Sequence, residues 1–326
     1  MASSDPGPAP APSLSPAERR PLDRGVAGAM LLLCAIWGAQ QVAIKLAAPD
    51  VVPMMQVALR SGLSALLLAA FAVVRGEPIS LGGPTARPGA VAGALFAVEF
   101  LFIAEGLRHT SASHMAVFLY TAPVFTALGL HLFLPAERLR RRQWLGVGVA
   151  FGGIALAFLG GGLAGGGGGL AFWGDLCGVL AGAAWGATTV VIRTTALSEA
   201  PANRTLLYQL LGAFVLLLPV ALAASRTAGV SLTAVSVASL LFQGVVVSFA
   251  SYLAWFHLLR RYLASRLSVF SFLTPIFGVA FGVLVLSDPI TPSFGAGAAL
   301  VLAGIALVSG WDLLRKAPAG SRAGAE

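Results

Sequence analysis

Two residues of opposite charge, Glu99 and Arg60, lie inside long apolar segments of the chain. Counted by helical rise from one end of its segment, each lies roughly 12 to 13 Å deep, so the two could meet at one level of a helical bundle. A carboxylate at such a depth is costly unless it has a partner or a proton. Two interpretations stay open: a static pair that neutralises both charges, and a carboxylate that alternates between a proton and a ligand.

Other polar and aromatic residues in the apolar segments are candidates for lining a cavity. Gln40 and Gln41 occupy positions equivalent to Thr188 and Thr189 in the second half of the chain, and these groups suit either a ligand or ties between helices. Walls for a planar or cationic ligand could come from aromatic residues inside the segments. These are Trp37, Tyr120, Trp185, Tyr252 and Trp255.

Glu105 and His257 stand at equivalent positions, 152 residues apart, near the ends of their segments. Each is a candidate gate residue at a cavity mouth, and each is equally consistent with a solvated helix end. Lys45 and Arg193 also occupy equivalent segment ends, where a long basic side chain commonly anchors a helix at the membrane surface.

The apolar segments contain no set of residues typical of an enzyme. No His–Glu arrangement has metal-ligand spacing, and no Ser–His set or close pair of carboxylates occurs within them. The chain also lacks a glycine-rich phosphate loop followed by Lys and Ser or Thr, so we expect no ATP motor, cofactor or metal. Cys34 and Cys177 lie in apolar stretches and are expected to act as small packing residues.

Composition places these residues in a membrane. Of 326 residues, 57% are hydrophobic and 10% are charged, whereas a soluble domain carries about 25% charged residues. The net charge of +8 raises the question of nucleic acid, but no compact basic patch exists, and the arginines fall between apolar segments. The sequence therefore predicts an all-α integral membrane protein whose partners are the lipid bilayer and a small molecule.

Ten segments are long enough to span a bilayer as helices. They cover residues 26–47, 51–74, 89–107, 111–134, 144–161, 171–194, 203–224, 234–259, 265–287 and 292–310. We expect a disordered N-terminal tail over 1–25, a first five-helix repeat over 26–161 and a glycine-rich linker over 162–170. A second repeat over 171–310 and a C-terminal tail over 311–326 complete the chain.

The two halves share a register that indicates an internal repeat. Trp37-Gly38-Ala39 recurs 148 positions later as Trp185-Gly186-Ala187. Pro123 recurs as Pro275 at a separation of 152, and Glu137 aligns with Asp288 at 151. Repeats of this kind in an apolar chain are typical of transporters in which one half moves against the other around a central site.

Basic residues predict how the chain is oriented. With a cytoplasmic N-terminus, 17 of the 21 basic residues fall inside, three fall outside, and Arg60 lies within a span. This excess places both termini in the cytoplasm. Because each repeat has an odd number of spans, the second must enter the bilayer from the opposite face. We expect a multi-pass protein of the plasma membrane with ten transmembrane helices in two inverted five-helix repeats.

Glycine and proline mark where helices pack and bend. Gly174, Gly178, Gly182 and Gly186 recur every fourth residue and form one ridge, which we expect to pack within the chain. Shorter motifs of the same spacing, which we also expect to pack within the chain rather than between copies, are Gly148 with Gly152 and Gly278 with Gly282. Pro123 and Pro275 lie near the middle of the fourth and ninth spans, where we expect symmetry-related kinks beside a central cavity.

The order of these motifs resembles the drug/metabolite transporter superfamily, in its ten-helix EamA-type branch. The resemblance rests on the Trp-Gly first span ending in Lys45, on Arg60, on Gly106-Leu107-Arg108-His109-Thr110-Ser111-Ala112 and on Glu137, and it covers residues 26–310. Glu105 and His257 depart from it, because an aromatic residue is more common there, as does Asp288, where glutamate is usual. The resemblance implies two intertwined inverted repeats around a substrate cavity, and export or exchange of small metabolites or toxic compounds.

These observations favour secondary active transport of a small organic solute by alternating access. The resemblance favours efflux of an amino-acid-like metabolite or an amphiphilic compound, and without an ATP motor, protons are the natural driving ion. A channel-like facilitator is the alternative, and an intramembrane enzyme is a weaker one. The sequence leaves the substrate, the direction and the oligomeric state open.

Overall fold

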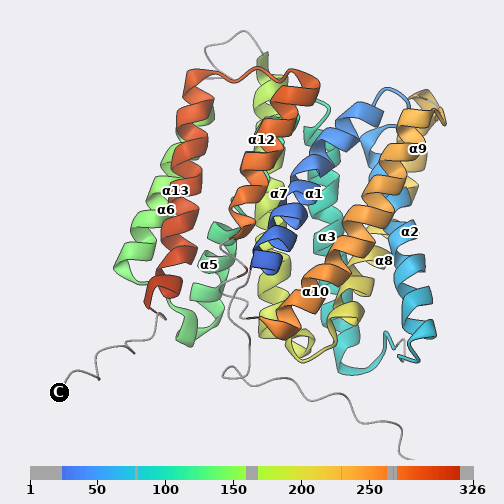
Figure 1. The fold of residues 1–326 in the computed structure, drawn as a ribbon, viewed down its shortest axis with the longest axis horizontal. Coiled ribbons are helices and arrows are strands. Elements are labelled where there is room, and N and C mark those ends of the chain that lie inside the picture. Colours follow the sequence, from blue (N-terminus) through green and yellow to red (C-terminus); the bar gives the residue numbers. More distant parts are fainter. Residues whose placement is uncertain are drawn as a thin grey trace, which may run out of the picture.

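The computed structural model describes residues 24–77, 80–158, 168–228, 230–262, 267 and 270–315. Over these residues the regular structure is helical, apart from an isolated bridge between Val51 and Val230. The longer helices form one bundle (Figure 1). They are α1 (Arg24–Ala47), α2 (Pro53–Val74), α3 (Ala86–Gly106), α4 (Ala112–Leu119), α5 (Ala122–Phe133), α6 (Arg141–Phe158), α7 (Gly168–Thr194), α8 (Ala202–Ala228), α9 (Ala234–Leu241), η5 (Phe242–Ser251), α10 (Tyr252–Arg261), α12 (Leu273–Leu286) and α13 (Pro292–Arg315).

Among the described residues, seven helical segments are long and apolar enough to cross a membrane. They follow seven of the predicted spans to within six residues at each end, and the helices over 273–286 and 292–308 are apolar but shorter. The predicted ninth span, 265–287, falls partly outside the described residues. The predicted linker, 162–170, extends too far toward the C-terminus, because α7 already begins at Gly168. The predicted tails, 1–25 and 311–326, are too long where they meet the bundle, because α1 begins at Arg24 and α13 continues to Arg315. Residues 1–23 and 316–326 lie outside the described residues.

The fourth span is not one continuous helix. Tyr120 and Thr121 separate α4 from α5, and Pro123 is the second residue of α5. A proline in the first turn sacrifices no intrahelical hydrogen bond, because the amides of that turn have no acceptor within the helix. In the second half, Phe272 interrupts the helix at the position equivalent to Tyr120, and Pro275 is the third residue of α12. Both prolines therefore begin a half-helix rather than bend the middle of a span.

The eighth span changes its winding. α9 continues into the ten-residue η5, which is π-helical, and then into α10. Such wide turns are rare and concentrate at functional positions. η5 ends at Ser251, directly before Tyr252, so the altered winding lies next to a predicted cavity residue.

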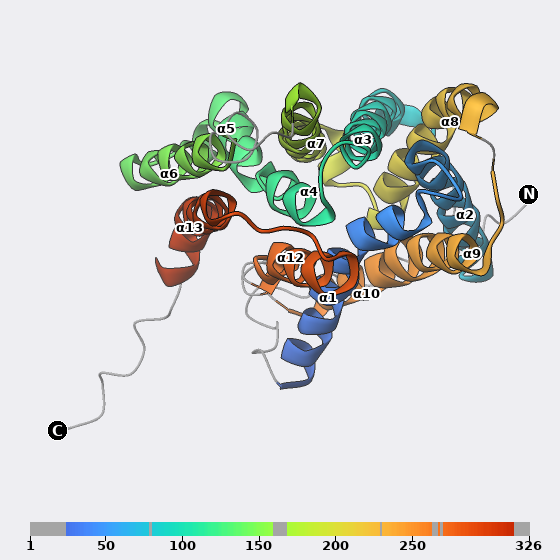
Figure 2. The ribbon, with the colours of Figure 1, turned by 90° about the horizontal axis from the view of Figure 1, so that it is seen from above.

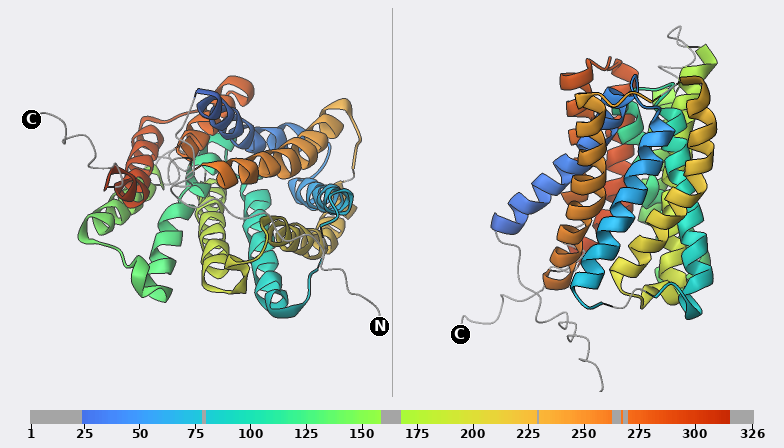
Figure 3. Two further views of the ribbon diagram at one scale, coloured as in Figure 1. Left: turned by 60° about the horizontal axis from the view of Figure 1, so that its bottom comes forward. Right: turned by 90° about the vertical axis from the view of Figure 1, so that its right-hand side faces the viewer.

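Two helix pairs form opposite edges of the bundle. α6 packs along α13 at one edge, and α2 packs along α8 at the other (Figures 1 and 2). Between them, α3 packs on α7, α1 on α12, and α4 and α5 on α7. The side view shows the helices running along a common direction, with the beginning of α1 leaning away from the bundle (Figure 3, right).

This packing is nearly unchanged when the two halves of the chain are exchanged. The sequence register equates α1 with α7, and α4–α5 with α12, so the α1–α12 contact corresponds to the contact of α7 with α4 and α5. In the same way, the packing of α3 on α7 corresponds to the packing of α9 and η5 on α1. α1 begins at the end of the bundle where α13 finishes, and α7 begins at the opposite end (Figure 1).

The glycine ridge of α7 packs within the chain, as expected. A Cβ on Gly178 would meet the Phe118 Cβ at 2.8 Å, and one on Gly182 would meet the Leu119 carbonyl oxygen at 2.9 Å. The ridge thus lets α7 lie directly on α4, α5 and the break between them. The expectation for Gly148 and Gly152 is wrong, since nothing lies within 4 Å of either Cβ position.

Candidate functional site

Arg60 is the largest of the fully buried side chains, with 2% of its surface exposed. It projects from α2 into the bundle, where an Nη atom donates a hydrogen bond of 3.1 Å to the side-chain oxygen of Gln40 on α1. Its guanidinium also lies 4.0 Å from the ring centroid of Phe100 on α3, a favourable cation–π geometry. The Nε atom of Arg60 has no hydrogen-bond partner among the described residues.

Glu99 lies beside Phe100 on α3 and is 5% exposed. It is near enough to interact electrostatically with Arg60, yet no ion pair within 4.0 Å joins them in the part of the chain that the structure describes. Its Oε2 atom is buried and finds no partner among those residues. Two buried groups of opposite charge therefore lie near each other, each with an unsatisfied polar atom.

Aromatic residues from both halves of the chain surround these charges. Tyr120, at the break between α4 and α5, meets Trp185 of α7 edge-to-face at 5.4 Å between ring centroids. Glu99 acts electrostatically on both Tyr120 and Tyr252. These contacts gather α3, α7, α10 and the break after α4 around one point of the bundle.

A second aromatic pair lies beside the altered winding of η5. Trp37 of α1 meets Trp255 of α10 edge-to-face at 5.8 Å, and its indole nitrogen donates a hydrogen bond of 2.8 Å to Ser251. The Ser251 hydroxyl donates in turn to the carbonyl of Val247, one turn back. The polar edge of Trp37 is therefore tied to η5, so this residue is held in place.

The predicted polar pairs differ in their surroundings. Gln40 contacts Arg60, whereas the side-chain oxygen of Gln41 is buried without a partner among the described residues. The hydroxyls of Thr188 and Thr189 donate to carbonyls of their own helix, at Ala184 and at Trp185. The threonines therefore have intrahelical partners.

Another amide network ties the first two helices to the eighth span. The Gln56 side chain donates to the carbonyls of Ile44 and Val51 and accepts a bond of 2.8 Å from Gln243. Ser239 donates to the carbonyl of Ala43 and accepts from Gln243. Sequence reasoning did not single out these amides, although both are polar residues within predicted spans.

Glu105 and His257 lie in different environments. At the end of α3, Glu105 pairs with Arg108 at 2.8 Å and with His109 at 3.1 Å, and the Arg108 side chain is 61% exposed. This cluster has the character of a solvated helix end. His257 lies on an exposed face of α10.

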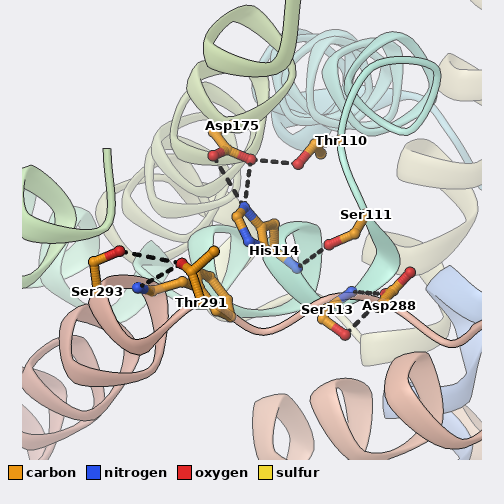
Figure 4. Close-up of polar contacts among 9 residues, drawn as sticks. Thr110, Ser111, Ser113, His114, Asp175, Asp288, Thr291 and Ser293 are labelled. Carbon is orange, nitrogen blue, oxygen red and sulfur yellow. Dashed lines mark hydrogen bonds and ion pairs between the residues drawn. The ribbon is translucent and has the colours of Figure 1, made fainter. Parts of the chain in front are cut away.

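A buried ion pair that sequence reasoning missed lies near the beginning of α7. His114 of α4 places its Nδ1 atom 3.0 Å from both carboxylate oxygens of Asp175 on α7, which also accepts a hydrogen bond from Thr110 (Figure 4). The side chains of the pair are 15% and 6% exposed. The imidazole stacks on Phe294 of α13 at 3.7 Å, with 8° between the planes.

Ser113, the neighbour of His114, ties α4 to the loop before α13. Asp288 accepts hydrogen bonds of 2.9 and 2.8 Å from the backbone nitrogen and hydroxyl of Ser113 (Figure 4). The first turn of α4 is therefore joined both to α7 and to this loop. The signal was available: His114 and Asp175 are ionisable residues inside predicted spans, where such residues are rare and commonly functional.

Glu137 and Arg193 form an exposed ion pair between the loop after α5 and the last turn of α7. By the repeat register their counterparts are Asp288 and Lys45, which interact electrostatically but form no ion pair within 4.0 Å in the described part of the chain. In the residues described, no three His, Cys, Asp or Glu side chains are arranged to hold a metal ion.

Comparison with known proteins decides the family. The EamA-like transporter family matches residues 25–159 and again 172–310. The chain belongs to this family. Its two matched stretches coincide with the two predicted repeats to within two residues at each end, and family members are membrane transporters.

Two bacterial relatives of the chain are described as transport proteins. A probable amino-acid metabolite efflux pump of Salmonella typhimurium is 26% identical over 84% of this chain and 91% of that protein. An uncharacterized inner membrane transporter, YedA, of Escherichia coli (strain K12) is 26% identical over 78% of this chain and 81% of that one. A crystal structure with 20% identity covers 90% of this chain and 99% of its own, with a TM-score of 0.60, which supports the fold alone.

Proposed function

We propose that this chain is a secondary active transporter that exports a small organic solute, an amino-acid-like metabolite or an amphiphilic compound, by alternating access. It would span the plasma membrane ten times as two inverted repeats. The observation that carries the proposal is the pair Arg60 and Glu99: opposite charges buried in a membrane bundle, close together and unsatisfied. A structural pair would be expected to close its hydrogen bonds.

The unsatisfied atoms match a ligand that carries both charges. A guanidinium with a free Nε can donate to a carboxylate, and a carboxylate with a free oxygen can accept from an ammonium group. Phe100 holds the guanidinium from one side, and Tyr120 and Trp185 offer aromatic surface beside the charges. The site thus suits a zwitterion with an apolar or aromatic side chain, in agreement with the description of the Salmonella relative as a probable amino-acid metabolite efflux pump.

Transport can be tested with purified protein in proteoliposomes. Metabolite profiles of cells with and without the protein supply candidate amino acids, which are then offered as labelled solutes. We expect saturable flux, counterflow exchange, and competition by zwitterions that exceeds competition by the corresponding amines or acids. A flux that is non-saturating and independent of any gradient would instead identify a channel.

We also predict that both termini face the cytoplasm. Single cysteines are introduced into a cysteine-free variant, either at positions 162–167 of the predicted linker or in the basic loop 138–140. An impermeant thiol reagent added to intact cells should label the linker and spare the basic loop, because 17 basic residues mark the inner side. The reverse pattern would overturn the assigned orientation.

A further inference from the structure

His114 and Asp175 form an ionisable pair that the central site does not use. The pair connects α4 of the first half of the chain to α7 of the second. His114 lies in the first turn of α4, and its side chain keeps 15% of its surface exposed. The imidazole is therefore held by buried groups and can still exchange a proton with water.

A carboxylate and an aromatic ring lie directly against the imidazole. Nδ1 faces both oxygens of the Asp175 carboxylate at 3.0 Å, and Phe294 covers one ring face at 3.7 Å. A carboxylate and an aromatic face both stabilise a cation. If His114 loses its proton, Asp175 becomes a buried carboxylate held only by neutral hydrogen bonds, and the contact between α4 and α7 weakens.

Several other charged or titratable groups lie around the pair and can contribute to a dependence on pH. They are Cys177 on α7, Glu105 with Arg108 and His109 at the end of α3, Asp288 on Ser113, and Lys45 of α1, which interacts with Asp288. On α13, Ser293, which is drawn in Figure 4, and Phe294, which stacks on the imidazole, are uncharged. Asp175 is the carboxylate in direct contact with the imidazole.

We propose that His114, held by Asp175 and Phe294, is a proton-binding site that keeps α4 and α7 together at the end of the bundle where α7 begins. Binding a proton closes this end, and losing the proton allows it to open. Acidity on the side that this end faces would therefore keep it closed; in the proposed transporter, on which this point rests, that side is the outer one.

The native residue Cys177 offers a direct probe of this contact. It is fully buried, two residues after Asp175, and its Cβ lies 2.9 Å from the position of a Cβ on Gly106 at the end of α3. A reagent can reach it only if α3 and α4 move away from α7. Replacing Cys34 with alanine leaves Cys177 as the single thiol.

The test compares labelling rates of Cys177 in lipid nanodiscs, where both faces meet the same buffer, with native His114 and with His114→Gln. Thiol chemistry itself speeds up as pH rises, so the informative quantity is the ratio of the two rates at each pH. We expect the glutamine variant to react about tenfold faster near pH 5.5, below the ordinary titration range of an imidazole. Near pH 8 the two rates should converge.

Two further variants make the outcome decisive. Asp175→Asn should behave like His114→Gln, because it removes the charge that holds the imidazolium, and it serves if the glutamine variant fails to fold. Asp288→Asn removes a carboxylate at the same end without a histidine partner, so its rate ratio to the native protein should not change with pH. A ratio for His114→Gln that is also constant with pH would overturn the proposal.

The same variants distinguish the proposed proton site at His114 from the proposed transport function. A pH-dependent ratio in a protein that moves no solute would support the proton site and contradict the transport function. A constant ratio in a protein that transports normally would contradict the proton site and leave transport standing.

Discussion

Replacing Glu99 with glutamine is expected to abolish flux driven by a pH gradient while leaving substrate exchange measurable at raised substrate concentration. Glutamine fills the same space but cannot take up or release a proton, so coupling is lost. Its amide binds an ammonium group less well than a carboxylate does, so KM for exchange should rise. Gradient-driven uptake and counterflow in proteoliposomes measure the two effects separately.

Glu199→Gln is the matched control for this result. Glu199 is an exposed carboxylate between α7 and α8, far along the chain from the central residues. The same chemical change there should leave gradient dependence and KM unaltered. Normal gradient-driven transport by a folded Glu99→Gln variant would refute a coupling role for Glu99.

A purely structural role for Glu99 predicts a different pattern. If Glu99 serves only to neutralise Arg60, the single variant leaves a buried guanidinium without compensation and lowers thermal stability. Arg60→Gln in the same protein should then restore much of that stability. If Arg60 instead binds the substrate carboxylate, the double variant loses the exchange activity that Glu99→Gln keeps, so stability and exchange together distinguish the two roles.

The sequence predicted the spans because their signal is local. A run of about 20 apolar residues is sufficient to recognise a membrane helix, and seven such helices lie close to their predicted bounds. The breaks within spans were harder to place. Pro123 indicated a disruption of the fourth span, but a proline is also tolerated in the first turn of a helix, and the chain breaks three residues earlier at Tyr120.

The site was predictable only where one residue carries the signal. Arg60 and Glu99 stood out as charges inside apolar segments, and both are buried. Their separation, and the contact of Arg60 with Gln40 instead, depend on how α1, α2 and α3 pack, which a linear sequence does not state. His114 and Asp175 lie 61 positions apart, in different halves, so their pairing appears only once α4 lies against α7.

Glycine spacing was an incomplete guide for the same reason. Small residues four apart mark a smooth helix face but do not say whether another helix covers it, so Gly148 and Gly152 proved to be uncovered. One of the tightest backbone contacts between helices joins α3 to α8, at a pair of glycines that sequence reasoning did not single out. A Cβ on Gly212 of α8 would lie 2.5 Å from the Cα of Gly93 on α3.

Gly212→Ala is therefore expected to lower the thermal unfolding midpoint of the purified protein by about 5 °C. The three atoms that the new methyl group would meet all belong to the backbone of Gly93, at 2.5 to 2.7 Å, so α3 and α8 must separate to admit it. Because the contacting atoms belong to the backbone, no side-chain rotation can relieve the clash, and the strain exceeds the gain of about 1 kcal/mol that alanine brings to a helix interior.

Gly148→Ala is the matched control: nothing lies within 4 Å of its Cβ position, so the same substitution in α6 should be neutral or slightly stabilising. Equal midpoints for the two variants would mean that α3 and α8 do not approach as closely as Gly93 and Gly212 indicate.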